Sequence, residues 1–167
     1  MELWDLYDEN RNVIGEHVRG EELPENGYHM VVHIWLKNKK GQYLIAQRAP
    51  SREKNPLMWE CQGGSVLKGE DSCTAAMREV KEEVGVDLKK ENGKVVFSKT
   101  RHYVDGKKFN DIMDVWLFEY DGKVDLKNAT TEEVADTKWM YPEEVMQLYK
   151  DKKLVWTLEY FFDKIAA

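Results

Sequence analysis

Residues 63–86 read GGSVLKGEDSCTAAMREVKEEVGV, and this stretch decides the fold and the chemistry expected of the chain. Its apolar residues recur at helical spacing from residue 72 to residue 84, so at about 100° per residue they fall on one face of a helix. Asp71 stands where an N-cap is expected, and Gly85 can adopt the left-handed conformation that ends a helix sharply. The residues of the packed face are Cys73, Ala76, Met77, Val80 and Val84.

The flank and back of this helix are acidic, because Glu79, Glu82 and Glu83 lie at positions i, i+3 and i+4. Exposed like charges at this spacing repel each other by about 0.2–0.5 kcal/mol per pair, and by more when they are partly buried. A divalent cation such as Mg²⁺ or Mn²⁺ would relieve the repulsion, because both ions prefer carboxylate and phosphate oxygens. A solvated charged helix face is the alternative interpretation of the same residues.

A longer pattern runs from Gly64 to Val86, with fixed spacing between its glycines, acids and arginine. Written out, it is G-x5-E-x7-R-E-U-x-E-E-x-G-U, where U is aliphatic, and it resembles the Nudix box at every defined position. The resemblance implies an α/β fold, the Nudix α/β/α sandwich with a mixed sheet. It also implies an enzyme that hydrolyses a diphosphate linkage with Mg²⁺ or Mn²⁺, usually one that joins a nucleoside diphosphate to another group.

The same resemblance implies roles for individual residues of the box. Metal ions would neutralise the charge that develops when water attacks phosphorus, and would lower the pKa of that water. Arg78 matches the residue that orients a box carboxylate through a charge-assisted pair, with an ordinary surface arginine as the alternative. The residues that match metal ligands are Glu79, Glu82, Glu83, the main-chain carbonyl of Gly63 and, as an auxiliary ligand often bound through water, Glu70.

The general base is expected among four acids, because members of the Nudix family draw it from the box or from a distant loop. Glu82 and Glu83 are the box candidates. Glu132 and Glu133, in the segment NATTEEVADTKW, are the loop candidates, with Glu133 slightly preferred. Exposed loop carboxylates are common, so an ordinary surface position is the alternative for the loop pair.

Residues outside the box resemble one branch of the family, the branch of type I isopentenyl diphosphate isomerases and their hydrolase-like relatives. An isomerase would need a cysteine, an acid and metal-binding histidines. His29 matches one of those histidines, but Gly63 stands at the cysteine position and Ser65 at a nearby histidine position. Glu22 falls where another histidine is expected, and Cys61, two residues from Gly63, keeps the isomerase open as an alternative. Hydrolysis is favoured, with isomerisation and diphosphate binding without turnover as alternatives.

Four residues outside the box are candidates for substrate binding. Arg48 and Arg52 flank the loop that leads toward the box, where guanidinium groups could hold phosphates. Trp59 offers an aromatic face for a base, and His29 shares one face of an expected strand with His33. Surface arginines, a core tryptophan and polar strand residues are the alternative interpretations.

The segments around the box predict a mixed sheet between helices. Residues 1–27 predict an N-terminal β-hairpin extension, and Asp105-Gly106 marks a second hairpin. Two helices would close the chain, over residues 142–149 and 154–165. The other expected strands lie within residues 28–49, 57–61, 94–104, 108–120 and 137–142.

The whole chain of 167 residues fits a single Nudix domain, since domains usually hold about 100–200 residues. Its formal net charge of −6 argues against binding to long nucleic acid, which needs a basic face. No stretch is long and apolar enough to span a membrane, and two cysteines without metal-binding spacing suit a reducing cytoplasm. The expected partner is therefore a small diphosphate, and the aromatic C-terminal segment leaves a homodimer open.

Overall fold

The computed structural model describes residues 1–167, which form nine strands, two α-helices and several short helical turns. A two-stranded antiparallel sheet consists of β1 (Leu3–Tyr7) and β2 (Val13–Val18). The remaining strands form one seven-stranded sheet. Its members are β3 (His29–Lys37), β4 (Tyr43–Arg48), β5 (Trp59–Glu60), β6 (Gln62–Ser65), β7 (Gly93–Val104), β8 (Lys107–Glu119) and β9 (Val134–Met140), and the α-helices are α1 (Ser72–Val84) and α2 (Pro142–Lys150).

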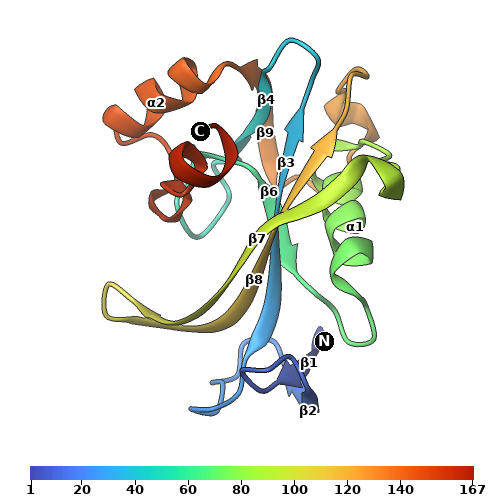
Figure 1. Cartoon of the computed structure of the whole chain (residues 1–167), viewed down its shortest axis with the longest axis vertical. Helices are drawn as coiled ribbons and strands as arrows, with labels where there is room; N and C mark the ends of the chain where they lie inside the picture. Colours follow the sequence, from blue (N-terminus) through green and yellow to red (C-terminus); the bar gives the residue numbers. More distant parts are fainter.

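Strand β3 is the branch point of the larger sheet (Figure 1). It runs parallel to β8 along its whole length, and β7 lies antiparallel beside β8. On its other side, β3 pairs with β6 over residues 31–34 but with β4 only at Lys37 and Tyr43. Strand β4 pairs instead with β5 and β9. The separation of β4 from β3 leaves room for β6 to lie against the middle of β3.

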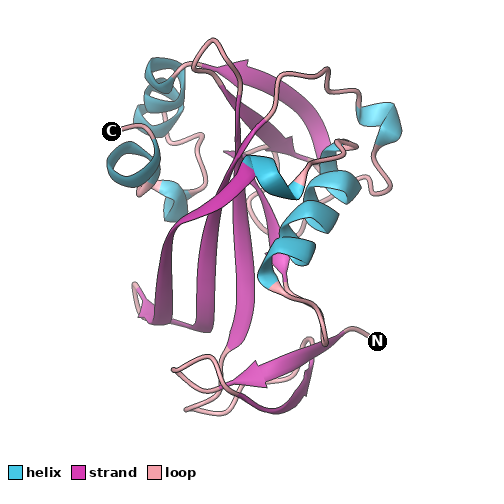
Figure 2. Ribbon diagram, turned by 45° about the vertical axis from the view of Figure 1, so that its right-hand side comes forward, coloured by secondary structure: helices cyan, strands magenta, loops and turns pink.

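Helices cover both faces of this sheet, with α1 on one side and α2 and the C-terminal turns on the other (Figures 1 and 2). Successive residues of β3 enter the two cores in turn: Ile34 packs on the α1 side, and Trp35 packs on the C-terminal side. This alternation follows from the period of a strand. The expected α/β/α sandwich with a mixed sheet and an N-terminal hairpin is confirmed.

The helix predicted over residues 72–84 is α1, and both of its ends form as the sequence indicates. The Asp71 carboxylate accepts a hydrogen bond from Thr74 N at 2.7 Å. Gly85 has a φ of 73°, and its N–H donates to Lys81 O at 3.0 Å. A Cβ at Gly85 would also lie 2.6 Å from the Asn128 backbone, so this position needs glycine for its conformation and for its close contact.

The prediction of a regular helix over residues 154–165 is wrong. The chain instead forms a 3₁₀ turn at Trp156–Leu158 and a π-helix at Phe161–Ile165. Phe161 is fully buried between Trp35 and Tyr43, with ring centroids 4.6 and 5.0 Å away. Tertiary packing of the aromatic rings therefore sets the backbone here, and it overrides the helical spacing. The same packing buries the C-terminal segment on the chain's own sheet.

The N-terminal hairpin lies against the loop that precedes α1. Lys68 N donates to Leu3 O at 2.9 Å, and Gly69 N donates to the Asp5 carboxylate at 2.9 Å. At the tip of the hairpin, Arg11 forms an ion pair with the buried Asp114 of β8. These contacts fix the box loop from outside the sheet. None of the helices has the length and apolar character needed to cross a membrane.

Candidate active site

Two adjacent glycines in β6 open the space in which the box acids gather. A Cβ on Gly64 would overlap the Glu79 carboxylate, so the missing side chain is what admits this acid from α1. A Cβ on Gly63 would lie 2.6 Å from the carbonyl oxygen of Val32 on β3. Both positions therefore require glycine: Gly64 because the Glu79 carboxylate lies against it, and Gly63 because strand β3 lies against it.

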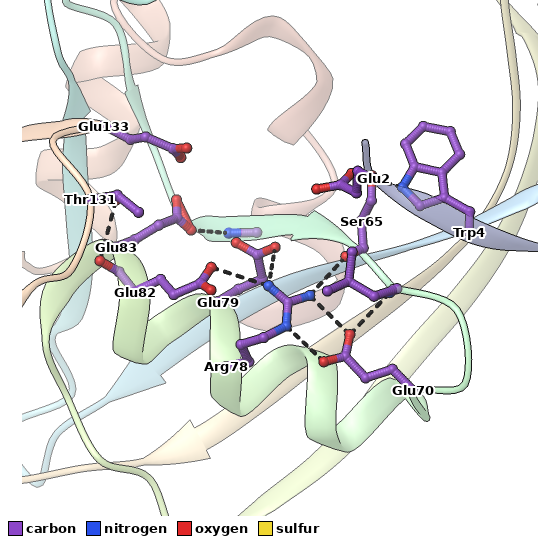
Figure 3. A network of polar contacts seen from close by, with 12 residues as sticks. Glu2, Trp4, Ser65, Glu70, Arg78, Glu79, Glu82, Glu83, Thr131 and Glu133 are labelled. Carbon is purple, nitrogen blue, oxygen red and sulfur yellow. Dashed lines mark hydrogen bonds and ion pairs between the residues drawn. The ribbon is translucent and has the colours of Figure 1, made fainter. Parts of the chain in front are cut away.

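Arg78 ties the box acids together (Figure 3). Its Nε and Nη2 atoms donate to the two carboxylate oxygens of Glu70 at 2.7 and 2.9 Å. Its Nη1 atom donates to Glu79 at 3.0 Å and to Glu82 at 3.1 Å. The hydrogen bonds to Glu70 raise the pKa of Arg78 further, so the guanidinium stays charged. This geometry is that of a positioning residue, which holds each carboxylate in one orientation.

Glu83 departs from the arrangement predicted for the helix, in which the acids occupy a face separate from the packed one. It is 4% exposed and counts among the buried residues of α1 with Val80 and Val84. One of its oxygens accepts a hydrogen bond from Gly63 N at 3.0 Å. The helix can bury this acid because the glycine strand β6, with its bare backbone, lies directly against it.

Burial raises the pKa values of three acids of the site. It raises the pKa of Glu79 to about 7, against the opposing effect of Arg78. It also raises the pKa of Glu83 well above its usual range, and the neighbouring acids Glu79 and Glu60 add to the effect. Glu60, from β5, has its own pKa raised by burial despite its ion pair with Arg48. In each case burial penalises the charged form, and for Glu79 and Glu60 the neighbouring arginine offsets this only in part.

The carboxylates suit a divalent metal ion by their donor chemistry, although in this structure they are turned toward Arg78 and Gly63 and do not converge as a three-ligand group. The Arg78 guanidinium is the only cation paired with Glu70, Glu79 or Glu82, and Glu83 is paired with none. Hard carboxylate oxygens are the donors that Mg²⁺ and Mn²⁺ prefer. A metal ion among Glu79, Glu82 and Glu83 would remove the cost of burying their charges.

Of the two loop candidates for the general base, the structure places Glu133 near the box and Glu132 away from it. Glu133 forms an ion pair with Arg52 at 2.8 Å, and its side chain extends toward Glu83 (Figure 3). Its charge is close enough to add to the rise that burial causes in the pKa of Glu83. Glu132 is exposed and forms none of the polar contacts of the site.

A cavity of about 230 Å³, which we call the inner cavity, opens beside these acids on the C-terminal face of the sheet. Arg48 and Arg52 line it, together with Glu60 and Glu83. Arg48 pairs with Glu60 at 2.7 Å, which orients the guanidinium at the cavity wall. The two predicted phosphate-binding arginines are thus brought to the acids of the box.

The other two predicted substrate-binding residues lie elsewhere. Trp59 is partly buried and packs into the core on the C-terminal side, so it does not line the inner cavity. His29 stacks on Trp4 with ring centroids 4.2 Å apart; it lies outside the inner cavity but lines a neighbouring cavity of about 590 Å³. Burial lowers the pKa of His29 to about 4, so its ring is neutral at pH 7.

A buried aromatic network behind the inner cavity includes a residue that the sequence did not indicate. The Tyr160 hydroxyl lies 2.8 Å from His33 Nδ1 and accepts a hydrogen bond from Trp35 Nε1 at 3.0 Å. An indole N–H can only donate, so the hydroxyl proton of Tyr160 is free to be donated to His33. Burial lowers the pKa of His33 to about 3, and the neutral ring lines the cavity beside Gly63.

Sequence reasoning missed Tyr160 because it lay within a predicted regular helix, and no spacing marks it. Thr157 and Leu158, which also line the inner cavity, were missed for the same reason. Glu60 had a usable signal, since it stands three residues before Gly63 and an acid there is expected near the box.

Cys61, the only cysteine near the glycines, is 4% exposed. Burial raises the pKa of its thiol well above the usual range. Its thiolate is therefore strongly disfavoured, whereas nucleophilic or acid–base cysteines require the opposite shift. This position behaves as part of the core.

Known proteins that resemble this chain are Nudix proteins. A family model described as NUDIX domain matches residues 27–164. An uncharacterised Nudix hydrolase of Listeria innocua, lin0387, is 38% identical over 164 residues, which cover 97% of this chain and 91% of the relative. Its counterpart lmo0368 of Listeria monocytogenes is 37% identical over the same coverage.

Solved structures share the fold. The crystal structure of DR0079 from Deinococcus radiodurans superposes with a TM-score of 0.72 at 23% identity, over 92% of this chain and 92% of that one. The NUDIX domain of Shewanella oneidensis NrtR, crystallised with ADP ribose, superposes with a TM-score of 0.58 at 16% identity, over 72% of this chain and 77% of that one.

Proposed function

This chain belongs to the Nudix hydrolase family, and we propose that it hydrolyses the diphosphate linkage of a small nucleotide-derived substrate with Mg²⁺ or Mn²⁺. The observation that carries the proposal is the convergence of Glu79 and Glu83 on the side-chain-free strand at Gly63 and Gly64. Glu83 is buried with no cation paired to it and Glu79 is paired with Arg78 alone, so the site gains most from a ligand that brings metal and phosphate together.

The residues of the chain divide the work as follows. Glu79, Glu82 and Glu83 and the Gly63 carbonyl would hold the metal, with Glu70 as an auxiliary ligand, and the metal supplies charge neutralisation at phosphorus and a more acidic water. Arg78 keeps the box carboxylates oriented. Arg48 and Arg52 line the same cavity, where they would bind the phosphate oxygens.

Hydrolysis then needs one proton acceptor. The water oxygen forms a bond to one phosphorus while the bond from that phosphorus to the bridging oxygen breaks, and the leaving phosphate takes that electron pair. We assign the water proton to Glu133, with Glu82 and Glu83 as the alternatives from the box. Glu133 lies beside Glu83, keeps 45% of its side chain exposed and is held by Arg52, so it can approach bound water.

A nucleotide-derived substrate is supported by two observations. The NUDIX domain of NrtR, which shares this fold, was crystallised with ADP ribose, a nucleoside diphosphate derivative. The inner cavity of this chain supplies arginines and room for a metal, the chemistry that a diphosphate needs. The cytoplasmic location and the homodimer stay predictions.

Isomerisation of a prenyl diphosphate is disfavoured by the same geometry. A cysteine at position 63 would collide with the Val32 carbonyl, because a Cβ there lies only 2.6 Å from it. Cys61 is buried with its thiol pKa raised, so it cannot take that role. The site lacks a reactive thiol but keeps the full set of box acids.

The proposal is tested by a screen for released nucleotide and phosphate with Mg²⁺ or Mn²⁺. Substrates include ADP-ribose, NADH, coenzyme A, nucleoside triphosphates and a prenyl diphosphate. Wild type should hydrolyse at least one nucleotide-derived compound, and Glu83→Gln should lower kcat on the order of 10³-fold. Glu83→Gln should fold, because the amide resembles the protonated acid that burial favours. The matched control is Glu143→Gln, an exposed acid of α2.

The remaining outcomes separate the alternatives. Isomerised prenyl product without released phosphate would establish the isomerase. Tight nucleotide binding without product would establish a binding module. The base is tested by Glu133→Gln, which should lower kcat while the affinity for Mn²⁺ changes less than twofold. A loss of Mn²⁺ affinity in that variant would instead make Glu133 a metal ligand.

A further inference from the structure

Beside the inner cavity lies a second cavity, of about 590 Å³, which we call the outer cavity. Lys54 of the loop before β5, Lys107 at the start of β8 and the C-terminal Trp156 stand around it. The residues that line both cavities, and so form the boundary between them, are Arg48, Val155 and Thr157.

The cavity volumes favour a substrate that extends beyond the inner cavity. Pockets that enclose a small organic ligand usually measure about 300–1,000 Å³. The inner cavity, at about 230 Å³, falls below this range and suits a diphosphate with its metal. The outer cavity, at about 590 Å³, falls within it and adjoins the arginines of the site.

The outer cavity carries an excess of positive charge. Arg48 is paired with Glu60, and Asp111 is paired with Arg101 at 2.7 Å, so these charges cancel. Lys108 lies 3.8 and 3.7 Å from two acids of the N-terminal segment. Lys54 and Lys107 have no acidic partner and are exposed at the mouth of the cavity. An anionic group that entered here would therefore meet two free ammonium groups.

A third cavity, of about 580 Å³, adjoins the inner one but carries no excess of positive charge. Arg101, which lines it, is already paired with Asp111. The remaining charged residues of its lining are Lys99 and Lys164 against Asp105, Glu159 and Asp163, so it offers an anion no comparable attraction. The outer cavity is therefore the better place for the charged remainder of a substrate.

An aromatic wall completes the outer cavity. Trp156 keeps 39% of its surface exposed. Its ring meets Phe109 edge to face, with centroids 6.2 Å apart, and Phe109 is itself covered by Arg101. Exposed tryptophan rings bind nucleobases by stacking, whatever the base.

We propose that the outer cavity binds the nucleoside half of the substrate, with the base on Trp156 and an additional phosphate of that nucleoside on Lys54 and Lys107. This inference rests on the proposed diphosphate hydrolysis, and it narrows the substrate class to nucleoside diphosphate derivatives that carry a further 2′- or 3′-phosphate. Base and extra phosphate share one cavity, so they belong to the same half of the molecule.

Binding tests the inference without turnover. Adenosine 3′,5′-bisphosphate and AMP differ only in the 3′-phosphate, and neither contains the diphosphate linkage. Calorimetric titration of the Mg²⁺-loaded protein should give a Kd about 10-fold lower for the bisphosphate, as expected for charge-assisted contacts. Equal affinity for the two ligands, or no binding of either, would overturn the proposal.

Variants assign the two contacts separately. Lys54→Ala/Lys107→Ala should abolish the preference for the bisphosphate and leave AMP binding unchanged. Lys123→Ala/Lys127→Ala removes the same charge from exposed lysines outside the cavities and should keep the preference. Trp156→Leu should raise the Kd of both AMP and the bisphosphate about 10-fold. A preference that survives in the first double variant, or unchanged affinities in Trp156→Leu, would overturn the corresponding contact.

Turnover separates this inference from the proposed function. Wild type should hydrolyse NADPH with a higher kcat/KM than NADH, and coenzyme A with a higher kcat/KM than its 3′-dephosphorylated form. Hydrolysis of every compound without such a preference would overturn the outer-cavity assignment alone. Hydrolysis of none would overturn the proposed function, while the titrations would still decide whether the cavity binds the extra phosphate.

Discussion

Helix α1 and the C-terminal segment of residues 154–165 approach the same inner cavity from opposite faces of the sheet (Figure 1). The acids of α1 are fixed by a capped helix and by one arginine that bonds two of them together with Glu70 of the preceding loop. Thr157 and Tyr160 of the C-terminal segment are held by aromatic packing in a 3₁₀ turn and near a π-helix. One side is specified by local sequence, and the other by tertiary contacts.

This difference between α1 and the C-terminal segment matches the different roles that we assign to them in the site. The helix contributes acids whose spacing is a chemical requirement, so its residues cannot vary independently. The C-terminal segment contributes the cavity wall and a supporting hydroxyl, which depend on shape rather than on spacing. We therefore expect substitutions in the box to act mainly on kcat, and substitutions in the C-terminal segment to act mainly on KM and on substrate choice.

The largest effect is expected for Gly64→Ala. A methyl group at this position would overlap the Glu79 carboxylate and push it from its place, while the fold is kept because the displaced atoms end a flexible side chain. We expect kcat to fall on the order of 10²–10³-fold, with little change in Tm. Kinetics and thermal unfolding of the same preparation measure both quantities.

Two glycine substitutions serve as controls for that experiment. Gly15→Ala has no atom within 4 Å of the new methyl group and should leave kcat unchanged. Gly63→Ala meets the Val32 backbone instead of a side chain, so it should lower Tm as well as activity. If Gly64→Ala lowered Tm as much as Gly63→Ala, its loss of activity could be explained by lost stability and would not show that Glu79 had been displaced.

Arg78→Lys is expected to have the next largest effect. Lysine keeps the charge but cannot reproduce the two-pronged contact with Glu70 while it also bonds Glu79 and Glu82. Loss of a residue that orients metal ligands typically costs about 10–100-fold in metal affinity or activity. Titration with Mn²⁺, followed by paramagnetic resonance, measures the affinity directly. An unchanged Kd for Mn²⁺ would show that the arginine does not position the ligands.

The sequence predicts helix α1 and its acids well, and it predicts the C-terminal segment poorly. The box helix, its caps and its acids could be predicted because helix geometry turns spacing into position. The burial of Glu83 could not, because it depends on β6 lying against α1. The last predicted helix failed because Phe161 packs between aromatic rings of two distant strands. Contacts across the sheet leave no local spacing to detect, so Tyr160 and Trp156 were visible only in the structure.

The raised pKa of Glu79 predicts how the free energy of unfolding of the metal-free protein depends on pH. Burial raises the pKa of Glu79 to about 7 from an ordinary value of 4.5. Between these values the folded protein binds more protons than the unfolded chain, so the free energy of unfolding falls as the pH rises through this window. In EDTA, we expect Tm to be several degrees lower at pH 8 than at pH 5.5.

Metal and a variant sharpen that prediction. Mg²⁺ or Mn²⁺ binds the deprotonated acids, so it should raise Tm more at pH 8 than at pH 5.5. Glu79→Gln should flatten the fall in Tm with pH in EDTA, since the amide does not titrate. A slope that is the same in Glu79→Gln and in wild type would assign the pH dependence to other groups.

The smallest effect on catalysis is expected for Tyr160→Phe. The substitution removes the hydroxyl that accepts from Trp35 and lies 2.8 Å from His33 Nδ1, and it leaves both partners buried without a replacement. Such losses usually cost about 1–3 kcal/mol of stability. The acids of the box lie on other elements, so kcat should change less than about threefold while KM rises several-fold.

A spectroscopic readout distinguishes positioning from packing alone in Tyr160→Phe. If Tyr160 donates to Nδ1, wild-type His33 carries its proton on Nε2, on the ring edge that faces Gly63 and the cavity. ¹⁵N shifts of the imidazole should then show this tautomer in wild type and a mixture of tautomers in the variant. Tyr43→Phe removes another hydroxyl on the same face, 3.4 Å from the Ile165 carbonyl, and should leave the His33 tautomer unchanged. An Nδ1-protonated ring in wild type would show that His33 donates to Tyr160 instead, and the hydroxyl would then not fix a proton on the ring edge that faces the cavity.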